Sequence, residues 1–252
     1  MGVVNVTPDS FSDGGWYFDP DAAVAHALRL AGEGADILDL GGESTRPGYT
    51  PIDVDTEAAR VVPVIAALAG RTNVPISIDT TKAEVAGAAL AAGASIVNDV
   101  WGLQRDPEMA AVCAGAGVDV VIMHNHESMD PGRDIVADML AFFDRSLTIA
   151  RRAGIADTRV LLDPGIGFGK TPAQSLAALR AVPRLKALGF RVLVGASRKA
   201  VIGHVTGRAV GDRLAGTLAA HLWAASAGAD VIRVHDMAAH RDALAMWETL
   251  AA

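Results

Sequence analysis

Short apolar runs alternate with longer alanine-rich segments along the chain. The apolar runs are rich in β-branched residues and begin at Gly2, Asp36, Pro75, Ala94, Val118, Arg159, Arg191 and Asp230. They are almost continuously apolar and lack the in-and-out alternation of a half-exposed strand. Such runs are typical of strands that are covered on both faces and paired in parallel. The pattern therefore predicts eight parallel strands.

The segments between these runs carry the signals of helix starts. Asp19 and Thr171 each precede a proline, which is the order of a capping residue and a first helical residue. The stretch "TKAE" from Thr81 has the spacing of a capping box. Eight strand–helix units predict an α/β fold, a (β/α)8 TIM barrel that residues 1–252 form as a single domain. An open, doubly wound sheet is the structural alternative.

Polar residues gather where the predicted strands end. In a barrel, the carboxyl ends of the strands and the loops after them form one mouth, where catalytic residues lie. These positions hold Asn5, Thr7, Asp9, Asp13, Ser44, Thr45, Arg46, Asp79, Asn98, Asp99, Met123, His124, Asp163, Ser197, Arg198, Lys199, Arg233, His235 and Asp236. We therefore expect the functional site at this mouth.

The charges in this set divide by position. Cations follow the seventh and eighth strands, which is where barrels commonly bind phosphate. Asp79, Asn98 and Asp163 follow other strands and suit a nitrogen heterocycle, whose amino group and ring N–H groups are donors. Asn5, Asp9 and Asp13 offer oxygen ligands of the kind that Mg²⁺ prefers. The residues thus predict a site for an amino-substituted heterocycle with a phosphorylated arm.

Composition and charge exclude several classes of protein. The chain is 51% hydrophobic and 20% charged, which favours a large core over disorder. Its net charge of −7 argues against nucleic acid and anionic membranes as partners. Cys113 is the only cysteine, so no internal disulfide can form. No leader and no long apolar run is evident, and we expect a cytoplasmic protein.

Seven motifs, in this order, carry a resemblance to a known family. They are "NVTPDSFSDGG", "GGESTRPG", "SIDT", "VNDV", "LLDPGIGFGK", "VGASRK" and "IRVHD". With them the chain resembles the dihydropteroate synthases of the folate pathway over essentially its whole length. The resemblance implies that 6-hydroxymethyl-7,8-dihydropterin diphosphate and 4-aminobenzoate give 7,8-dihydropteroate and diphosphate. It also implies Mg²⁺ as cofactor, a homodimer and a target of sulfonamides.

The same resemblance implies roles for matching residues. The pterin pocket would be lined by Asp79, Asn98, Met123, Asp163 and Lys199. The diphosphate would be met by Thr45, Arg233 and His235, and Mg²⁺ would be bound by Asn5. The aminobenzoate would be bordered by Phe168 and Lys199, and covered by loops that carry Phe11, Thr45, Arg46 and Pro47.

The implied chemistry is a dissociative substitution. Asp13 would face the carbon that becomes electron-poor as its C–O bond breaks. Arg233 and His235, together with Mg²⁺, would stabilise the charge that grows on the leaving group. With Lys199, these three residues form the predicted catalytic set.

One position departs from the family pattern. The residue after "SRK" is Ala200, where such proteins usually carry serine or arginine to hold the aminobenzoate carboxylate. Backbone N–H groups at the start of the following helix could bind that anion instead. A methyltetrahydrofolate-binding methyltransferase domain and a non-catalytic pterin-binding module are the functional alternatives.

Two further signals resemble sites but are better explained otherwise. "PGIGFGKT" fails as a phosphate-binding loop because Pro164 stands where that pattern requires glycine. His124 and His126 have the spacing of a zinc pair, but the sequence indicates no third ligand. His221 and His240, which belong to predicted helices, are expected to be surface or packing residues.

Overall fold

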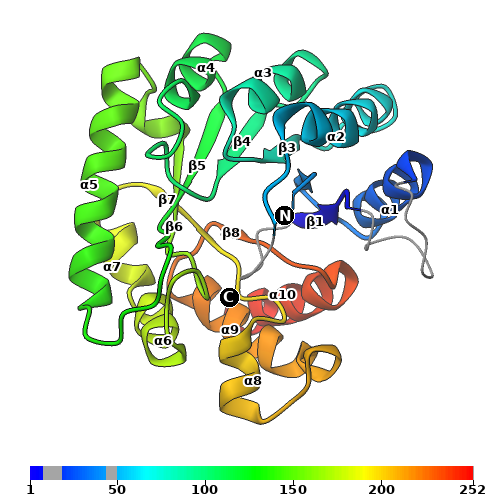
Figure 1. The fold of residues 1–252 in the computed structure, drawn as a ribbon. Helices are drawn as coiled ribbons and strands as arrows, with labels where there is room; N and C mark the ends of the chain where they lie inside the picture. The colour runs from blue at the N-terminus through cyan, green and yellow to red at the C-terminus, as the bar shows by residue number, and fades with distance from the viewer. Residues whose placement is uncertain (8–18, 44–49, 252) are drawn as a thin grey trace.

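The computed structural model describes residues 1–7, 19–43 and 50–251 and contains one sheet flanked by helices (Figure 1). Its strands are β1 (Gly2–Asn5), β2 (Leu38–Gly41), β3 (Ile76–Asp79), β4 (Ile96–Asp99), β5 (Asp119–Met123), β6 (Val160–Asp163), β7 (Arg191–Val194) and β8 (Val231–Ile232). Neighbouring strands are parallel and follow the order of the chain from β1 to β8. The predicted set of eight parallel strands is confirmed.

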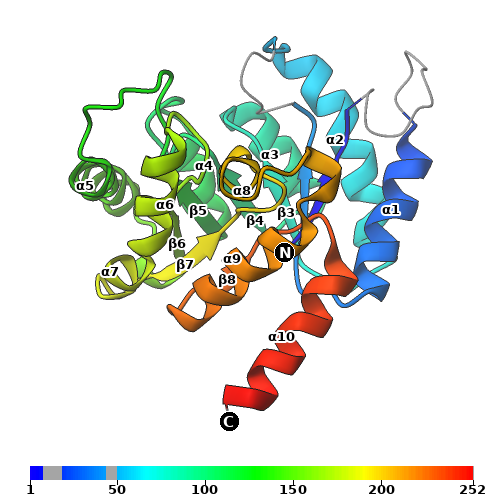
Figure 2. The same ribbon diagram turned by 90° about the horizontal axis from the view of Figure 1, so that it is seen from below.

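Helices connect the strands and lie around the outside of the curled sheet (Figures 1 and 2). They are α1 (Pro20–Gly32), α2 (Val54–Ala69), α3 (Ala83–Ala91), α4 (Met109–Ala116), α5 (Ile135–Ala153), α6 (Pro172–Arg180), α7 (Val182–Lys186), α8 (Ala200–Thr206), α9 (Leu214–Ser226) and α10 (Met237–Ala251). Short 3-10 turns cover Asp157–Arg159 and Val210–Asp212. The described residues include no helix that is long and apolar enough to cross a membrane.

Two of the three predicted helix starts are confirmed. Asp19 accepts the backbone N–H groups of the first turn of α1, and Thr171 forms a reciprocal capping box at the start of α6. The prediction for Thr81 was wrong, because α3 begins at Ala83. The N–H of Ala83 instead donates to a carboxylate oxygen of Asp106, which lies 23 residues further along the chain.

The two ends of the sheet are also joined by hydrogen bonds. Gly2 and Val234 form a parallel bridge beyond the end of β8. The N–H of Val3 donates to the carbonyl of Val234 at 3.0 Å, and the N–H of Val234 donates to the carbonyl of Met1 at 2.9 Å. These bonds connect β1 with the segment that follows β8 at the two ends of the curled sheet, as in a TIM-barrel-like fold.

Alternate residues of a strand lie on opposite faces of the sheet, and the two faces hold different buried clusters. The main core cluster lies between the sheet and the helices, and it includes Leu38, Ile78, Val97, Ile122 and Leu162. A second buried cluster is formed by residues of the opposite face: Met1, Ile96, Val121, Leu161 and Leu193. Two residues further along three of these strands stand Asn98, Met123 and Asp163. The inner face is therefore apolar near the start of the strands and polar near their carboxyl ends.

Candidate active site

An arginine from the end of the chain joins two carboxylates inside the mouth of the sheet. Arg233 donates through Nη2 to Asp79 at 2.8 Å and through Nε to Asp39 at 2.6 Å. Asn98, whose Cα is the register partner of that of Asp79, donates its amide N–H to the same Asp39 oxygen at 3.1 Å. Four side chains from four different strands or strand ends thus form one hydrogen-bonded group.

Asp39 was not recognised from the sequence as part of the site. It could be read there as an ordinary polar residue of a strand, like Asp36. The structure separates the two, since Asp39 is fully buried and paired with Arg233, whereas Asp36 has a side chain that is 79% exposed and lies near Arg241. The available signal was periodicity, because Asp39 is the one polar residue inside an apolar run.

The buried carboxylates keep oxygens that no described group satisfies. Oδ1 of Asp79 and Oδ1 of Asp39 are both buried without a hydrogen-bond partner in the described part of the chain. Burial raises the pKa of Asp79 to about 7, although the charge of Arg233 opposes this shift. Burial also raises the pKa of Asp163, against the opposing charge of Lys199. Such acceptors suit a ligand that brings its own N–H donors into the pocket.

Lys199 and Phe168 meet on another side of the same mouth. The Nζ of Lys199 lies 4.6 Å from the centre of the Phe168 ring, which is a cation–π contact. Burial lowers the pKa of Lys199 to about 8, while Asp163 opposes the shift. Gly167 and Gly195 lie beside this lysine, since a Cβ atom on either would be in ordinary van der Waals contact with its side chain, at 3.5 and 3.9 Å. Met123, the register partner of Asp163, is buried beside this group.

The glycine-rich segment after β6 is a tightly packed loop. Gly165 and Gly169 have φ angles of +63° and +55°, which favour glycine. A Cβ on Gly165 would lie 1.9 Å from the carbonyl oxygen of His124, and one on Gly169 would lie 2.5 Å from that of His126. Lys170 then donates from Nζ to the carbonyls of His124, Gly165 and Phe168 at 2.8–3.1 Å. The loop therefore needs its glycines to pack against the loop after β5.

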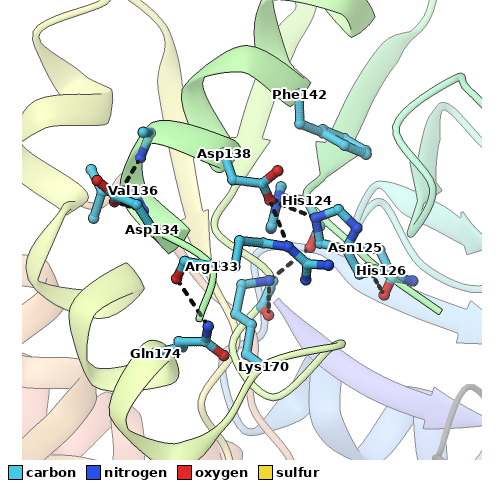
Figure 3. A network of polar contacts seen from close by, with 12 residues as sticks. His124, Asn125, His126, Arg133, Asp134, Val136, Asp138, Phe142, Lys170 and Gln174 are labelled. Atoms are coloured by element: carbon cyan, nitrogen blue, oxygen red, sulfur yellow. Dashed lines mark hydrogen bonds and ion pairs between the residues drawn. The ribbon is translucent and has the colours of Figure 1, made fainter. Parts of the chain in front are cut away.

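A histidine–carboxylate cluster lies behind this loop (Figure 3). His124 and His126 both hydrogen-bond through Nε2 to Oδ2 of Asp138, which belongs to the first turn of α5. Among the described residues, this is the group whose ligand atoms lie close enough together to hold a metal ion. The structure thus supplies a third side chain for the histidine pair, one that the sequence does not indicate because it stands on a helix.

The charges around the cluster oppose a bound cation. The Nε of Arg133 lies 4.0 Å from Oδ2 of Asp138, and the buried Lys170 acts electrostatically on both Asp138 and His124. Burial lowers the pKa of His124 to about 3, so its ring is neutral at physiological pH. The arrangement is best explained as a hydrogen-bond network that fastens the loop after β5 to α5.

Side chains of the loop after β7 form hydrogen bonds and an ion pair with side chains of the loop after β8. The Oγ of Ser197 lies 2.9 Å from Nδ1 of His235. Arg198 donates through Nε and Nη2 to the Asp236 carboxylate. Burial lowers the pKa of His235 to about 4, and the charge of Arg233 adds to the shift. The backbone N–H of His235 also donates to Ser197 Oγ, so the hydroxyl can donate in turn to Nδ1. The neutral ring then carries its proton on Nε2.

Asn5 ends β1 at the border of a cavity of about 770 Å³, whose lining also includes Arg198, His235 and Asp236. The cavity thus connects the predicted metal ligand with the predicted diphosphate-binding histidine. Several other predicted site residues lie outside the described residues, namely Phe11, Asp13, Thr45, Arg46 and Pro47.

The sequence-predicted residues that the structure describes fall into two neighbouring groups. The first contains Asp79, Asn98, Met123, Asp163, Phe168, Lys199 and Arg233, and the second contains Asn5 and His235. The first group combines the acceptors Asp79, Asn98 and Asp163 with two cations, and the second borders an open cavity. The arrangement can hold a flat donor-bearing ring in one part and an anionic arm in the other.

Comparisons with known proteins agree with this arrangement. A family model described as pterin binding enzyme matches residues 1–235. A dihydropteroate synthase of Clostridium beijerinckii is 44% identical over 238 residues, which cover 94% of this chain and 88% of that protein. A dihydropteroate synthase of Bacillus subtilis is 46% identical over 237 residues, covering 94% and 83%.

Solved structures show the same similarity in three dimensions. The dihydropteroate synthase of Xanthomonas albilineans with 4-aminobenzoic acid has a TM-score of 0.96 and 50% identity, with 100% of this chain and 92% of that one covered. The same enzyme in complex with 7,8-dihydropteroate gives a TM-score of 0.91 at 49% identity, covering 100% and 93%. The Yersinia pestis enzyme with a sulfonamide drug gives 0.92 at 39% identity, covering 100% and 93%.

Proposed function

This chain belongs to the dihydropteroate synthase family, and we propose how its residues divide the work of that reaction. The enzyme is a transferase of folate biosynthesis that joins 6-hydroxymethyl-7,8-dihydropterin diphosphate to 4-aminobenzoate. The C–O bond to the diphosphate breaks, and the diphosphate leaves with the electron pair. The amine nitrogen then bonds to the same carbon and loses a proton. The residues must therefore hold a ring, present an amine and accept a growing negative charge.

The pterin ring is bound by the acidic group at the strand ends. The observation that carries this assignment is the buried Oδ1 of Asp79, which has no partner in the described part of the chain. A pterin amino group and ring N–H would satisfy that oxygen together with Asp163. Asn98 and Met123 complete the pocket, the first by hydrogen bonding and the second by packing. The charge of Arg233 opposes the rise in the pKa of Asp79 and so favours its carboxylate form.

The aminobenzoate lies against Phe168 and Lys199. The contact between this ring and the Lys199 ammonium supports the assignment, since both groups then reach the same space. Lys199 retains its proton at neutral pH, because its pKa is about 8. It can therefore donate to the pterin or attract the aminobenzoate carboxylate. Ala200, at the start of α8, adds no side-chain donor here.

The diphosphate is held by His235 and Arg233, with Thr45 as a proposed partner, and Arg46 is assigned to the loop over the aminobenzoate. His235 acts as a neutral donor through Nε2, because Ser197 occupies its Nδ1 and its pKa is about 4. A donor fixed in this way can stabilise charge on the departing oxygens without reorganising. Asp13 is assigned to the reacting carbon, as the resemblance implies.

Mg²⁺ is proposed as the cofactor, and Asn5 as the residue that holds it. The neutral side-chain oxygen of Asn5 fits a Mg²⁺ ion that takes its other ligands from diphosphate and water. The fit is supported by the cavity that Asn5 shares with His235. When bound, the ion supplies positive charge that offsets the charge of the diphosphate.

Three further features belong to the proposal. A complete (β/α)8 barrel forming one domain is supported by the bridge between Gly2 and Val234. A homodimer is supported by apolar side chains on α8 and α9 that remain exposed, namely Val205 at 62%, Leu214 at 37% and Trp223 at 40%. A cytoplasmic location is supported by the single cysteine, which leaves no pair for an internal disulfide.

Product formation tests the whole assignment. The purified chain is mixed with the pterin diphosphate, and released diphosphate and dihydropteroate are measured with and without 4-aminobenzoate and Mg²⁺. We expect dihydropteroate only when both substrates are present, and faster turnover with Mg²⁺.

Asp79→Asn should raise the pterin Kd by about ten- to a hundredfold, because a full acceptor becomes partly a donor. An unchanged pterin Kd contradicts the assigned pocket.

A further inference from the structure

Helix α9 presents two buried polar side chains to the loop that follows β7. Thr217 and His221 lie four residues apart, on one face of the helix, and both are almost fully buried. The N–H of Ala196 donates to Nε2 of His221 at 2.9 Å, and the N–H of Arg198 donates to Oγ1 of Thr217 at 3.2 Å. Two backbone donors of the loop are thus satisfied from outside it.

A second histidine continues the chain of hydrogen bonds into the loop that follows β8. Nδ1 of His221 lies 2.9 Å from Nε2 of His240 on α10, and Nδ1 of His240 lies 2.7 Å from the carbonyl oxygen of Asp236. The end groups determine where the protons are. Because Ala196 can only donate and the Asp236 carbonyl can only accept, each ring must be neutral and carry its proton on Nδ1.

The loop held in this way has a strained backbone. Arg198 has a φ angle of +57°, in the left-handed region that a residue with a side chain rarely adopts. Its N–H is held by Thr217, its carbonyl accepts from Arg213 at 3.0 Å, and its guanidinium pairs with Asp236. His240 also holds the carbonyl of Asp236. The hydrogen bonds through His221, His240 and Asp236 therefore form a ring that the backbone from Ala196 to Arg198 closes.

We propose that Thr217, His221 and His240 are positioning residues for the synthase reaction, fixing the loops that carry Lys199 and His235 relative to each other. This proposal rests on the roles proposed above for those two residues. Lys199 directly follows the strained Arg198, and His235 directly precedes the Asp236 carbonyl. A shift of either loop would move an amine or an imidazole that must meet the substrate, and errors of about 1 Å are costly in catalysis. None of the three belongs to the residues that the proposed function assigns to substrate binding.

Because both histidine rings are neutral, a proton added to either ring would break the chain of hydrogen bonds. A proton added to Nε2 of His221 would face the Ala196 N–H, and one added to Nε2 of His240 would face the proton of His221. Burial lowers the pKa of both histidines below their ordinary value. The charged or titratable groups that face the pair are the α-amino group of Met1, Lys199, His235 and Asp236.

The test compares three substitutions with an exposed control. His221→Leu removes the acceptor for Ala196, Thr217→Val removes the acceptor for Arg198 in nearly the same volume, and His221→Gln restores an acceptor oxygen. His204→Leu, at an exposed histidine on α8, is the control. For each variant, kcat, the two KM values and the thermal midpoint are measured, and the ring protons of the wild type are located by long-range ¹H–¹⁵N NMR.

We expect kcat of His221→Leu and Thr217→Val to fall at least tenfold in protein that remains folded, with partial recovery in His221→Gln. We expect the control to keep kcat within twofold, and both wild-type rings to show the Nδ1–H form at pH 7. Unchanged kcat in folded His221→Leu and Thr217→Val overturns the proposal, as does a ring that is charged at pH 7. If the wild type makes no dihydropteroate, the proposed function fails instead, while the NMR result still tests the hydrogen-bond chain.

Discussion

Arg233 donates through Nη2 to Asp79 at 2.8 Å, although the two residues are 154 positions apart in the chain. The same guanidinium also serves Asp39, so one cation balances two buried carboxylates. The pocket therefore holds more acceptor capacity than the described donors satisfy. A ligand with N–H groups would supply the missing donors, and the protonation state of Asp79 should change when it binds.

Pterin binding should release protons in the wild type near pH 6.5. Asp79 has a pKa of about 7, so much of it is protonated at this pH in the empty pocket. Donors of the pterin stabilise the carboxylate and lower its pKa, which expels a fraction of a proton. Calorimetry in buffers of different ionisation enthalpy measures this number. Asp79→Asn should lose the release, whereas the exposed Asp36→Asn should keep it. Equal release in all three proteins contradicts the role of Asp79.

Gly165→Ala should destabilise the protein strongly. Its φ of +63° disfavours a side chain, and the new Cβ would collide with the His124 carbonyl, which is backbone and cannot move aside easily. We expect the free energy of unfolding to fall by at least about 2 kcal/mol. Gly115→Ala is the matched control, because this glycine lies in α4 with nothing within 4 Å of the new Cβ. It should gain up to about 1 kcal/mol. Equal urea midpoints for the two variants would refute the account of the loop.

The contribution of the buried histidines to stability should fall as the pH is lowered from about 6.5, while the raised pKa of Asp79 acts in the opposite direction. The pKa values of His124 and His235 are about 3 and about 4 in the folded protein, below those of the unfolded chain. The unfolded state therefore binds protons first, and each buried histidine costs up to about 1.4 kcal/mol of unfolding free energy per pH unit in this window. Urea unfolding at pH 7, 6 and 5 measures the slope. His124→Asn should lose less stability than the wild type between pH 7 and 5, and His204→Asn, at an exposed position, should follow the wild type. Equal pH dependence of the wild type and His124→Asn would show that the His124 ring titrates normally.

Trp223→Glu should separate the proposed homodimer. This side chain is 40% exposed on α9, and a buried charge would oppose association there. Sedimentation or light scattering should give the mass of two chains for the wild type and of one chain for the variant. Met246→Glu, at a side chain that is 58% exposed on α10, is the comparison. A wild type that sediments as a single chain at all concentrations excludes the dimer.

Much of the fold could be predicted from the sequence because it depends on local patterns. Parallel strands covered on both faces leave apolar runs, and the caps of α1 and α6 are satisfied within their own first turns. The cap of α3 is different, since its N–H partner is Asp106, far along the chain. No local spacing encodes such a contact, and the prediction for Thr81 failed for that reason.

Site residues that stand in motifs could be predicted from the sequence. Site residues that depend on contacts between distant segments could not. Asp79, Asn98, Asp163 and Lys199 stand in motifs and do gather at one mouth. The sequence marks Asp39 only as a polar residue inside an apolar run, and its pairing with Arg233, 194 positions away, is visible only in the structure. The carboxylate beside His124 was equally hidden, because Asp138 lies on a helix and reaches back by tertiary packing.

The pairing of Arg233 with Asp39 and Asp79 also bears on how the protein is made. During synthesis on the ribosome, both aspartates emerge long before the arginine, so a growing chain carries two acids destined for burial without their counter-ion. Closing the sheet before Arg233 arrives would bury uncompensated charge, which is costly. Chains that end before Arg233 should therefore lose stability as well as activity.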